Sequence, residues 1–517
     1  MECFARASAA APDRTEGWTA TAALALLRGR PREALEAALQ ARRADPDGAE
    51  PLLMLGSALY RLSVLAYSDS AFRAARERLP AELSRRFDGD LLLGVEREAG
   101  DGSSAGVGIE DAAWQGSDPD LTTTENEARL DYLTRLSLAW FLFRRGSEVR
   151  WDQRAELFVR YGPPAAIEYN SAEAQLGGKE LEFQYPRHSR VWYAPDPIPY
   201  PYNMQIWRYP DLGLEVALWD RSLSQSYALP YSFDRALDPL PDPTLVGARD
   251  DLVALAGGRG VFRAMAPGTH PMSVAGMASQ FPTSNGVRLL AHVWAKGEPT
   301  DSLSGSWALV DSQSRVVRRE SRALSISACD PTERQVAGFA ETVPSGDYRL
   351  DLAVGGSGGR RGVAHLRVHV DPVPAGLSMS DVVLVCGDRS VAVGSEAVPI
   401  EPSRDAYLSR ATTVIVYYEL EGLATGQAGV GRFVYTYSIR RAEARGRGVD
   451  PSPLFEATRE EENVGTHRRQ FVGVPVASLS AGRYELRIVV RDLLGGESVE
   501  NAARFVKDQR GIRVDPS

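Results

Sequence analysis

The sequence predicts a multidomain α + β protein with helical repeats at its N-terminus, a mixed α/β domain at its centre and two β-sandwiches at its C-terminus. Three observations support this. Ala/Leu-rich amphipathic segments recur early, a block dense in aromatic residues and proline follows, and short alternating strands separated by turns fill the last part of the chain. We place the domains at residues 15–98, 119–268, 269–372 and 373–510, with a linker at 99–118.

Length and composition limit the class of protein. A chain of 517 residues is long enough for about three or four domains with cores of their own. The net charge of −9 disfavours nucleic acid as the main partner. No apolar run approaches the roughly 20 residues that a membrane span needs, and the first residues lack the apolar core of a signal peptide. We therefore expect a globular protein with no membrane span and, as written, no export signal.

The cysteines indicate neither a disulfide framework nor a metal cluster, because Cys3, Cys329 and Cys386 are widely spaced and odd in number. No zinc-protease motif, phosphate-binding loop or dinucleotide fingerprint occurs in a suitable context. We expect no metal and no cofactor.

Two amphipathic helical segments near the N-terminus end at Pro46 and Pro80, which are 34 residues apart. This spacing is the period of the tetratricopeptide repeat. The residues at the key positions of that repeat are Trp18, Ala34, Ala41 and Pro46 in the first unit, and Leu55, Gly56, Phe72, Ala75 and Pro80 in the second. We expect tetratricopeptide-like antiparallel helix pairs, with Trp18, Leu55 and Phe72 buried between helices.

A capping helix is expected at 83–98, because two such units cannot cover both of their faces. After the linker, Thr124 and Glu127 have the spacing of a capping box. Apolar residues follow at helical spacing: Leu130, Leu133, Leu136, Trp140 and Phe143. This pattern predicts a helix that ends near Arg145 and leads into the central domain.

The central block, residues 151–220, contains 13 aromatic residues among its 70, against 43 in the whole chain. Alternating and β-branched segments predict strands at 156–161, 191–193, 204–209 and 214–219. A Gly-Pro-Pro turn follows the first of them, because proline lacks the donor that a ladder needs. A loop rich in proline and tyrosine precedes the third.

This order of elements resembles the GWxTD domain, a bacterial family of undefined activity. The matching residues are Arg154, Tyr161, Gly162, Pro163, Pro164, Ile206, Trp207, Tyr209 and Asp220. At the signature that names the family, the chain reads Val149-Arg150-Trp151-Asp152-Gln153-Arg154-Ala155, and only the arginine is in register. The resemblance covers residues 119–507 and implies a location in the periplasm or cell envelope.

Two segments of the C-terminal half echo each other. Residues 344–350 and 480–486 share Gly, Tyr and Leu at the same spacing. A glycine turn followed two residues later by tyrosine resembles the tyrosine turn of immunoglobulin-like sandwiches. We predict that Tyr348 and Tyr484 occupy equivalent places in two separate immunoglobulin-like domains, which divide near residues 371–374.

Two patterns in this half look catalytic but are better explained as structure. Gly355-x-Ser357-x-Gly359 matches the nucleophile pattern of hydrolases, but it lies between two expected strands and therefore predicts a hairpin. His365 and His369 are four residues apart on an expected strand, a span of about 13 Å, which is too long for one metal ion. We expect both histidines to be solvated.

The polar residues of the central block worth considering for a site are Asp152, Glu156, His188 and Asp220, and they do not form a recognisable catalytic set. We assign no catalytic residue and favour a non-enzymatic function. The alternative is a hydrolase or carbohydrate-active protein with His188 or Asp220 in a site of the central domain.

The aromatic residues are the candidate binding groups, because tyrosine and tryptophan concentrate binding energy at interfaces. The candidates are Trp192, Tyr200, Tyr202, Trp207 and Tyr209. Tyr200 and Tyr202 alternate with prolines, so they cannot lie in a regular central strand and should be exposed. We therefore expect a protein-interaction scaffold of the bacterial cell envelope that binds a protein partner through this block, with carbohydrate as the alternative ligand.

Overall fold

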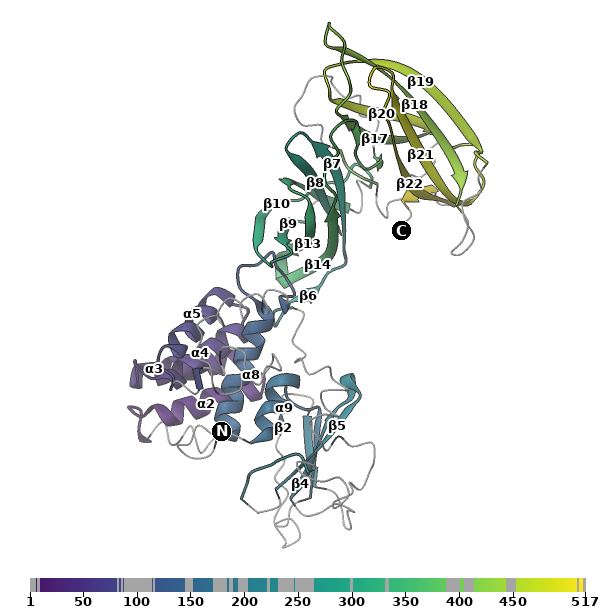
Figure 1. The fold of residues 1–517 in the computed structure, drawn as a ribbon. Coiled ribbons are helices and arrows are strands. Elements are labelled where there is room, and N and C mark those ends of the chain that lie inside the picture. The colour runs from purple at the N-terminus through teal and green to yellow at the C-terminus, as the bar shows by residue number, and fades with distance from the viewer. Residues whose placement is uncertain are drawn as a thin grey trace. The chain divides into compact units, whose positions relative to one another are not determined.

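The computed structural model describes residues 6, 10–80, 83, 84, 87, 114, 117–144, 152–170, 184–185, 189–193, 203–220, 224–230, 246, 265–297, 301–330, 334–386, 400–403, 413–442, 452–508 and 511–514, with the backbone alone at 170, 184–185, 189–193 and 513–514. The chain divides into two compact units, Met1–Gly268 and Thr269–Ser517. Figure 1 shows α-helices together with one sheet in the first unit and strands in the second, so the protein is a multidomain α + β chain.

The α-helices of the first unit are α2 (Thr15–Leu27), α3 (Pro31–Ala44), α4 (Ala49–Arg61), α5 (Leu65–Arg76), α8 (Glu127–Phe143) and α9 (Gln153–Tyr161). The helices α2 to α5 follow one another through short turns, and each packs against the next (Figure 1). None of the helices among the described residues is both long and apolar enough to cross a membrane.

The burial predicted for this part is confirmed at two of its three positions. Leu55 and Phe72 are buried, whereas Trp18 is only half-buried. Gly56 has a packing role, because a Cβ at this position would lie 2.9 Å from the ring of Phe72. The glycine lets α4 and α5 approach closely.

The N-cap of the helix α8 lies two residues after the expected one. The Asn126 side chain accepts a hydrogen bond from the backbone N–H of Arg129 at 2.9 Å, so Asn126 is the N-cap and the predicted capping box at Thr124 was wrong. Leu130 and Leu136 are buried as the helical spacing predicted.

The strand predicted at 156–161 was also wrong, because these residues belong to the helix α9. The Asp152 side chain accepts from the backbone N–H of Arg154 and caps the helix. The positive φ of Gly162, 81°, ends it. With nine residues, α9 is too short for a helical period to stand out from the alternation of a strand.

The sheet of the first unit contains β1 (Ala166–Asn170), β2 (Gln184–Tyr185), β3 (Ser189–Tyr193), β4 (Met204–Tyr209) and β5 (Leu214–Trp219), with the short 3₁₀ helix η2 (Pro210–Leu212) between the last two. Its order is β2-β3-β1-β4-β5, and the β1–β3 pair is parallel whereas the other pairs are antiparallel. The strands predicted at 191–193, 204–209 and 214–219 are confirmed, and β1 and β2 were missed. One hydrophobic core contains residues of the six described α-helices and of β1, β4 and β5.

The second unit consists of two β-sandwiches. The first contains β6 (His270–Pro271), β7 (Val274–Thr283), β8 (Gly286–Lys296), β9 (Leu303–Asp311), β10 (Val316–Ala323), β11 (Ser325–Ile326), β12 (Arg334–Val343), β13 (Gly346–Gly356) and β14 (Arg360–Val370), with the 3₁₀ turn η3 (Ser357–Gly359). Its two sheets have the orders β10-β9-β13-β14-β6 and β11-β12-β8-β7.

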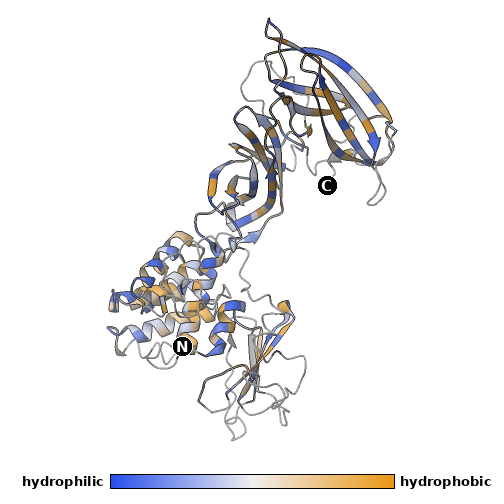
Figure 2. Cartoon of the chain, viewed as in Figure 1, coloured by the Kyte–Doolittle hydropathy of each residue, from blue (hydrophilic) through white to orange (hydrophobic). Residues whose placement is uncertain are grey.

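The second sandwich contains β15 (Ser378–Met379), β16 (Val383–Val385), β17 (Thr413–Glu421), β18 (Val430–Arg441), β19 (Phe455–Val464), β20 (Arg468–Pro475), β21 (Gly482–Asp492), β22 (Ser498–Asp508) and β23 (Gly511–Val514). One sheet has the order β15-β17-β16, with β20 also paired to β17, and the other has the order β19-β18-β21-β22-β23. Hydropathy alternates along these strands (Figure 2), as expected when one face of each sheet packs on a core.

The predicted equivalence of Tyr348 and Tyr484 is confirmed. Tyr348 donates to the Pro344 carbonyl oxygen at 2.9 Å, and Tyr484 donates to the Ser480 carbonyl oxygen at 2.7 Å. Each tyrosine belongs to the core of its own sandwich.

The hairpin predicted at the Gly-x-Ser-x-Gly pattern is also confirmed, since β13 and β14 pair antiparallel on either side of it. The side chains of His365 and His369 are 51% and 65% exposed, so both are solvated as predicted.

Candidate functional site

Two residues at the start of α9, Asp152 and the matching residue Arg154, hold a neighbouring stretch of chain, residues 224–229. The Asp152 carboxylate caps α9 and also accepts from the guanidinium of Arg154 at 2.6 Å and from the backbone N–H of Tyr227 at 3.2 Å. The guanidinium of Arg154 lies over the Tyr227 ring, 4.1 Å from its centroid, and donates to the Gln225 carbonyl oxygen at 3.1 Å. One ion pair thus fixes both the helix end and the 224–229 segment.

Asp220 holds the other end of this segment. Its carboxylate accepts from the backbone N–H groups of Ser224 at 3.0 Å and Gln225 at 2.6 Å, and the residue is 3% exposed. Gln225 has a φ of 61°, a conformation uncommon for a residue with a side chain. Asp220 therefore stabilises a tight turn, which is a structural task.

Tyr227 lies within this contact network. Burial raises the pKa of Tyr227 well above that of an ordinary phenol, and hydrogen bonding to Tyr169 adds to the effect. The Tyr227 hydroxyl donates to the Tyr169 hydroxyl at 3.2 Å, which in turn donates to the Asn203 side-chain oxygen at 3.3 Å. The Tyr227 phenol therefore stays protonated at neutral pH and can donate to Tyr169, so the chain of hydroxyls acts as a hydrogen-bonded brace.

Four more matching residues form the end of α9 and the turn after it, Tyr161, Gly162, Pro163 and Pro164. A Cβ on Gly162 would lie 3.4 Å from the guanidinium carbon of Arg135. The same guanidinium donates to the Arg160 carbonyl oxygen at 3.2 Å. The Tyr209 hydroxyl donates to the Gly162 carbonyl oxygen, also at 3.2 Å, and the rings of Tyr161 and Tyr209 meet edge to face. Pro163 and Pro164 follow, and proline cannot continue a helix.

Two of the five candidate binding residues are buried, which corrects their assignment as surface groups. Trp207 is 1% exposed and Tyr209 is 5% exposed. Both faces of β4 are covered, and the Trp207 ring packs against Phe143 of α8 at a centroid distance of 5.9 Å. Tyr200, Tyr202 and the side chain of Trp192 lie outside the described residues.

The alternative site of a hydrolase loses its support at Asp220, because two backbone amides already occupy that carboxylate. His188 lies outside the described residues. Among the residues that the structure describes, no group of three or more His, Cys, Asp or Glu side chains could hold a metal ion.

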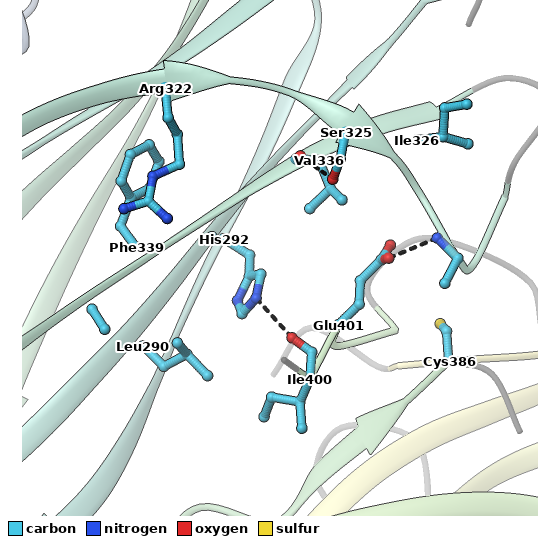
Figure 3. A pocket seen from close by; sticks show the side chains of 13 residues that line it. Leu290, His292, Arg322, Ser325, Ile326, Val336, Phe339, Cys386, Ile400 and Glu401 are labelled. Carbon is cyan, nitrogen blue, oxygen red and sulfur yellow. Dashed lines mark hydrogen bonds between the residues drawn. The ribbon is translucent and has the colours of Figure 1, made fainter. Parts of the chain in front are cut away.

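A cavity of about 600 Å³ lies in the second unit, where the first sandwich meets the second (Figure 3). Its floor is the outer face of β12, where Val336, Gly338 and Ala340 leave space because two of them are small. Leu290 and His292 of β8 form one wall (Figure 3). The remaining lining residues are Arg322, Ser325, Ile326, Ala328, Phe339, Cys386, Ile400 and Glu401.

His292 is buried in the wall of this cavity. Burial lowers the pKa of His292 to about 4, so its ring is neutral near pH 7. Its Nε2 lies 3.0 Å from the Ile400 carbonyl oxygen and therefore carries the proton. Gly338 makes room for this ring, because a Cβ there would lie 3.1 Å from Nε2.

A disulfide borders the same cavity. Cys329 and Cys386 are bonded, with their Cα atoms 5.0 Å apart, so the expectation of no disulfide was wrong for this pair. The bond joins the loop after β11 to the residue after β16 and so links the two sandwiches. Spacing in the sequence carries no information about such a pair, because folding brings the two residues together.

The Glu401 carboxylate adds to this joint, accepting from the backbone N–H of Ala328 at 2.7 Å and from the Trp294 indole at 3.4 Å. On the other side of the joint, Arg288 of β8 pairs with the buried Glu419 of β17 at 2.7 Å. The sandwiches are therefore held to each other by covalent, polar and apolar contacts, the last centred on Phe281 and Tyr417.

Sequence reasoning missed this cavity. Two signals pointed towards it, the small residues of the segment Val336-Ala337-Gly338-Phe339-Ala340 in a strand and the two cysteines of this half. Neither could be interpreted before the pairing of the strands was known.

No model of a known protein family matches the chain, and a search of curated proteins finds no match. Among solved structures, red sea bream transglutaminase is 11% identical, with 56% of this chain and 37% of that chain covered and a TM-score of 0.17. Escherichia coli alpha-2-macroglobulin is 9% identical, with 46% and 22% covered and a TM-score of 0.16. A tetra-tandem repeat of a large adhesion protein is 14% identical, with 46% and 49% covered and a TM-score of 0.14. Likenesses with such low TM-scores carry no argument about activity.

Proposed function

We propose that this chain is a non-enzymatic protein-interaction scaffold of the bacterial cell envelope. In this proposal, tetratricopeptide-like helix pairs form the N-terminal part, a GWxTD-like domain forms the centre, and two immunoglobulin-like sandwiches form the C-terminal part. Helical repeats and β-sandwiches are both widely used to bind proteins, which is an argument from fold alone.

The observation that carries the proposal is the use of the charged residues in the central domain. Asp152, Arg154 and Asp220 all contact the 224–229 segment, and the hydrogen bonds of their side chains go to groups of that segment or to Asp152 and Arg154 themselves. A catalytic site needs titratable groups that converge on a place where substrate can bind. Here the groups stabilise a fold, which favours a binding function over a hydrolytic one.

The disulfide supports the proposed compartment. Disulfides form and persist in oxidising environments such as the bacterial periplasm and are rare in the cytosol. The Cys329–Cys386 bond joins two sandwiches and is thus part of the tertiary structure. A protein stabilised in this way is suited to the envelope.

The test uses the two tyrosines that the Pro-rich loop of the central block should expose. The double variant Tyr200→Ala/Tyr202→Ala is expected to unfold at the same temperature as the parent. When both proteins are crosslinked in an extract of the host cell envelope, the variant should capture less of the partner protein than the parent does. The matched control Tyr169→Phe removes one hydroxyl of the brace and should leave capture unchanged. Equal capture by the double variant and the parent would disprove this role for the central block.

A further inference from the structure

The strand β12 has one fully paired side and one partly paired side. It pairs with β8 along its whole length, from Arg334 to Val343. On its other side it pairs with β11 only at Gln335 and Val336. The chain before β11 does not continue this pairing, because β10 belongs to the other sheet and pairs with β9.

The register shows which backbone groups this leaves open. The N–H of Ser327 donates to the carbonyl oxygen of Arg334 at 3.0 Å, so the polar groups of Arg334 point to the β11 side. Backbone groups alternate sides along a strand, and no bulge interrupts β12. The N–H and C=O groups of Gly338 and Ala340 therefore point to the open side, where they have no backbone partner among the described residues.

The same two residues form the floor of the cavity described above. Their missing or small side chains leave the hollow, and their backbone groups lie along its margin. Ile326, with 55% of its surface exposed, lies at the cavity on the β11 side (Figure 3). The hollow has apolar walls at Leu290, Ile326 and Ile400, and it also has polar groups at its border, His292, Arg322 and Glu401. An open strand edge next to such a hollow is the arrangement that receives an added strand, with main-chain hydrogen bonds for affinity and a pocket for a side chain.

We propose that the edge of β12 binds an extended peptide segment of a partner protein, which adds as a strand beside Gly338 and Ala340 and inserts one large apolar side chain into the cavity. This inference rests on the proposed scaffold function and names a second binding surface for it. A volume of about 600 Å³ is within the range of pockets that bind small molecules, so the cavity has room for one large apolar side chain.

The surroundings of the edge favour a single strand over a second copy of this chain. Arg322 borders the cavity on the side of β10, with its guanidinium 4.9 Å from the ring centroid of Phe339, and Ile400 and Glu401 border it on the side of the second sandwich. Two copies paired edge to edge would bring both sets of borders together. A lone extended segment brings no such borders of its own.

The experiment measures binding of fluorescein-labelled peptides, about nine residues long, with threonine at alternate positions and leucine or phenylalanine at the centre. Fluorescence anisotropy is recorded with the full chain. Ala340→Pro removes an N–H that points to the open side, so it should leave the unfolding temperature unchanged and weaken binding by about tenfold or more. Ala340→Ser keeps the N–H and should bind as the parent does.

A second variant tests the cavity. Ile326→Asp places a charge on its lining and should weaken binding of the phenylalanine and leucine peptides, while a peptide with proline at its centre should not bind the parent. Equal binding by the parent, Ala340→Pro and Ile326→Asp would overturn the proposal. The proposal would also be overturned if the parent sediments as a dimer and Ala340→Pro sediments as a monomer, because the edge would then bind a second copy.

The peptide assay does not depend on the central block. If the Tyr200→Ala/Tyr202→Ala variant captured as much partner as the parent, the proposed role of the central block would fail, but the result of the peptide assay would stand.

Discussion

At the residue scale, Glu127 is the group whose charge depends most clearly on its environment. It is 3% exposed in the first turn of α8, where the Thr123 hydroxyl donates to its Oε1 at 2.9 Å. Burial, together with the negative charges of Asp118 and Asp120, raises the pKa of Glu127 to about 8. The folded protein therefore keeps this carboxyl protonated at pH values where an unfolded chain has lost the proton.

This pKa shift predicts a pH dependence of stability with a definite sign. Between about pH 4.5 and 8 the folded state binds more protons at Glu127 than the unfolded state, so the free energy of unfolding should fall as pH rises. The slope should be at most about 1.4 kcal/mol per pH unit, the value for one proton. Glu127→Gln has no proton to lose, so its urea unfolding curves should show a flatter pH profile and greater stability than the parent at pH 8. A parallel profile in the two proteins would contradict the assigned pKa.

At the scale of elements, α9 and the 224–229 segment depend on one carboxylate. Asp152 caps the helix, pairs with Arg154 and accepts from the backbone of Tyr227. Helix and segment are far apart in the sequence, so neither can supply this contact alone. Their stability should therefore be coupled.

Substitution of Asp152 should reveal this coupling. Asp152→Ala removes the cap and the ion pair and should cost about 2 kcal/mol, while Asp152→Asn keeps a capping oxygen and should cost about 1 kcal/mol. Amide hydrogen exchange at Tyr227 should accelerate most in the alanine variant. Faster exchange confined to α9, with Tyr227 unchanged, would show that the segment does not depend on this residue.

At the scale of the whole molecule, the disulfide is the one covalent crosslink among the described residues, and it closes a long loop. The cysteines are 57 residues apart, and the chain-entropy estimate for such a loop is about 4 kcal/mol. Cys329→Ser/Cys386→Ser should lower the stability of the second unit by about this amount. Hydrogen exchange of β13 and β21 should accelerate, while that of α4 in the first unit stays the same.

The control for this prediction is the stability of the parent and of the double serine variant with and without a reductant. Treatment with dithiothreitol should bring the parent to the stability of the double serine variant and should leave that variant unchanged. A parent that resists the loss of stability on full reduction would mean that Glu401, Arg288 and the apolar contacts hold the joint without the bond.

Local spacing along the chain was enough to predict the elements whose patterns are long or repeated. Three central strands and the helix α8 form where periodicity placed them, the two N-terminal segments with a helical pattern belong to α3 and α5, and the turns before Tyr348 and Tyr484 recur in two sandwiches. These features depend on local spacing, because the side chains that decide them are neighbours along the chain. The aromatic content of the central block was also evident, but its meaning was not.

What the aromatic residues of the central block do depends on contacts that form only when the chain folds. Trp207 and Tyr209 face a core on β4 because α8 and α9 pack there, and a count of rings cannot distinguish a covered face from an open one. The nine residues of α9 became a helix through a cap and through packing against α8. The Cys329–Cys386 bond and the open edge of β12 depend on which strands pair and where a strand changes sheet. Such contacts join residues distant in sequence, so the physical reason for them appears only when the chain is folded.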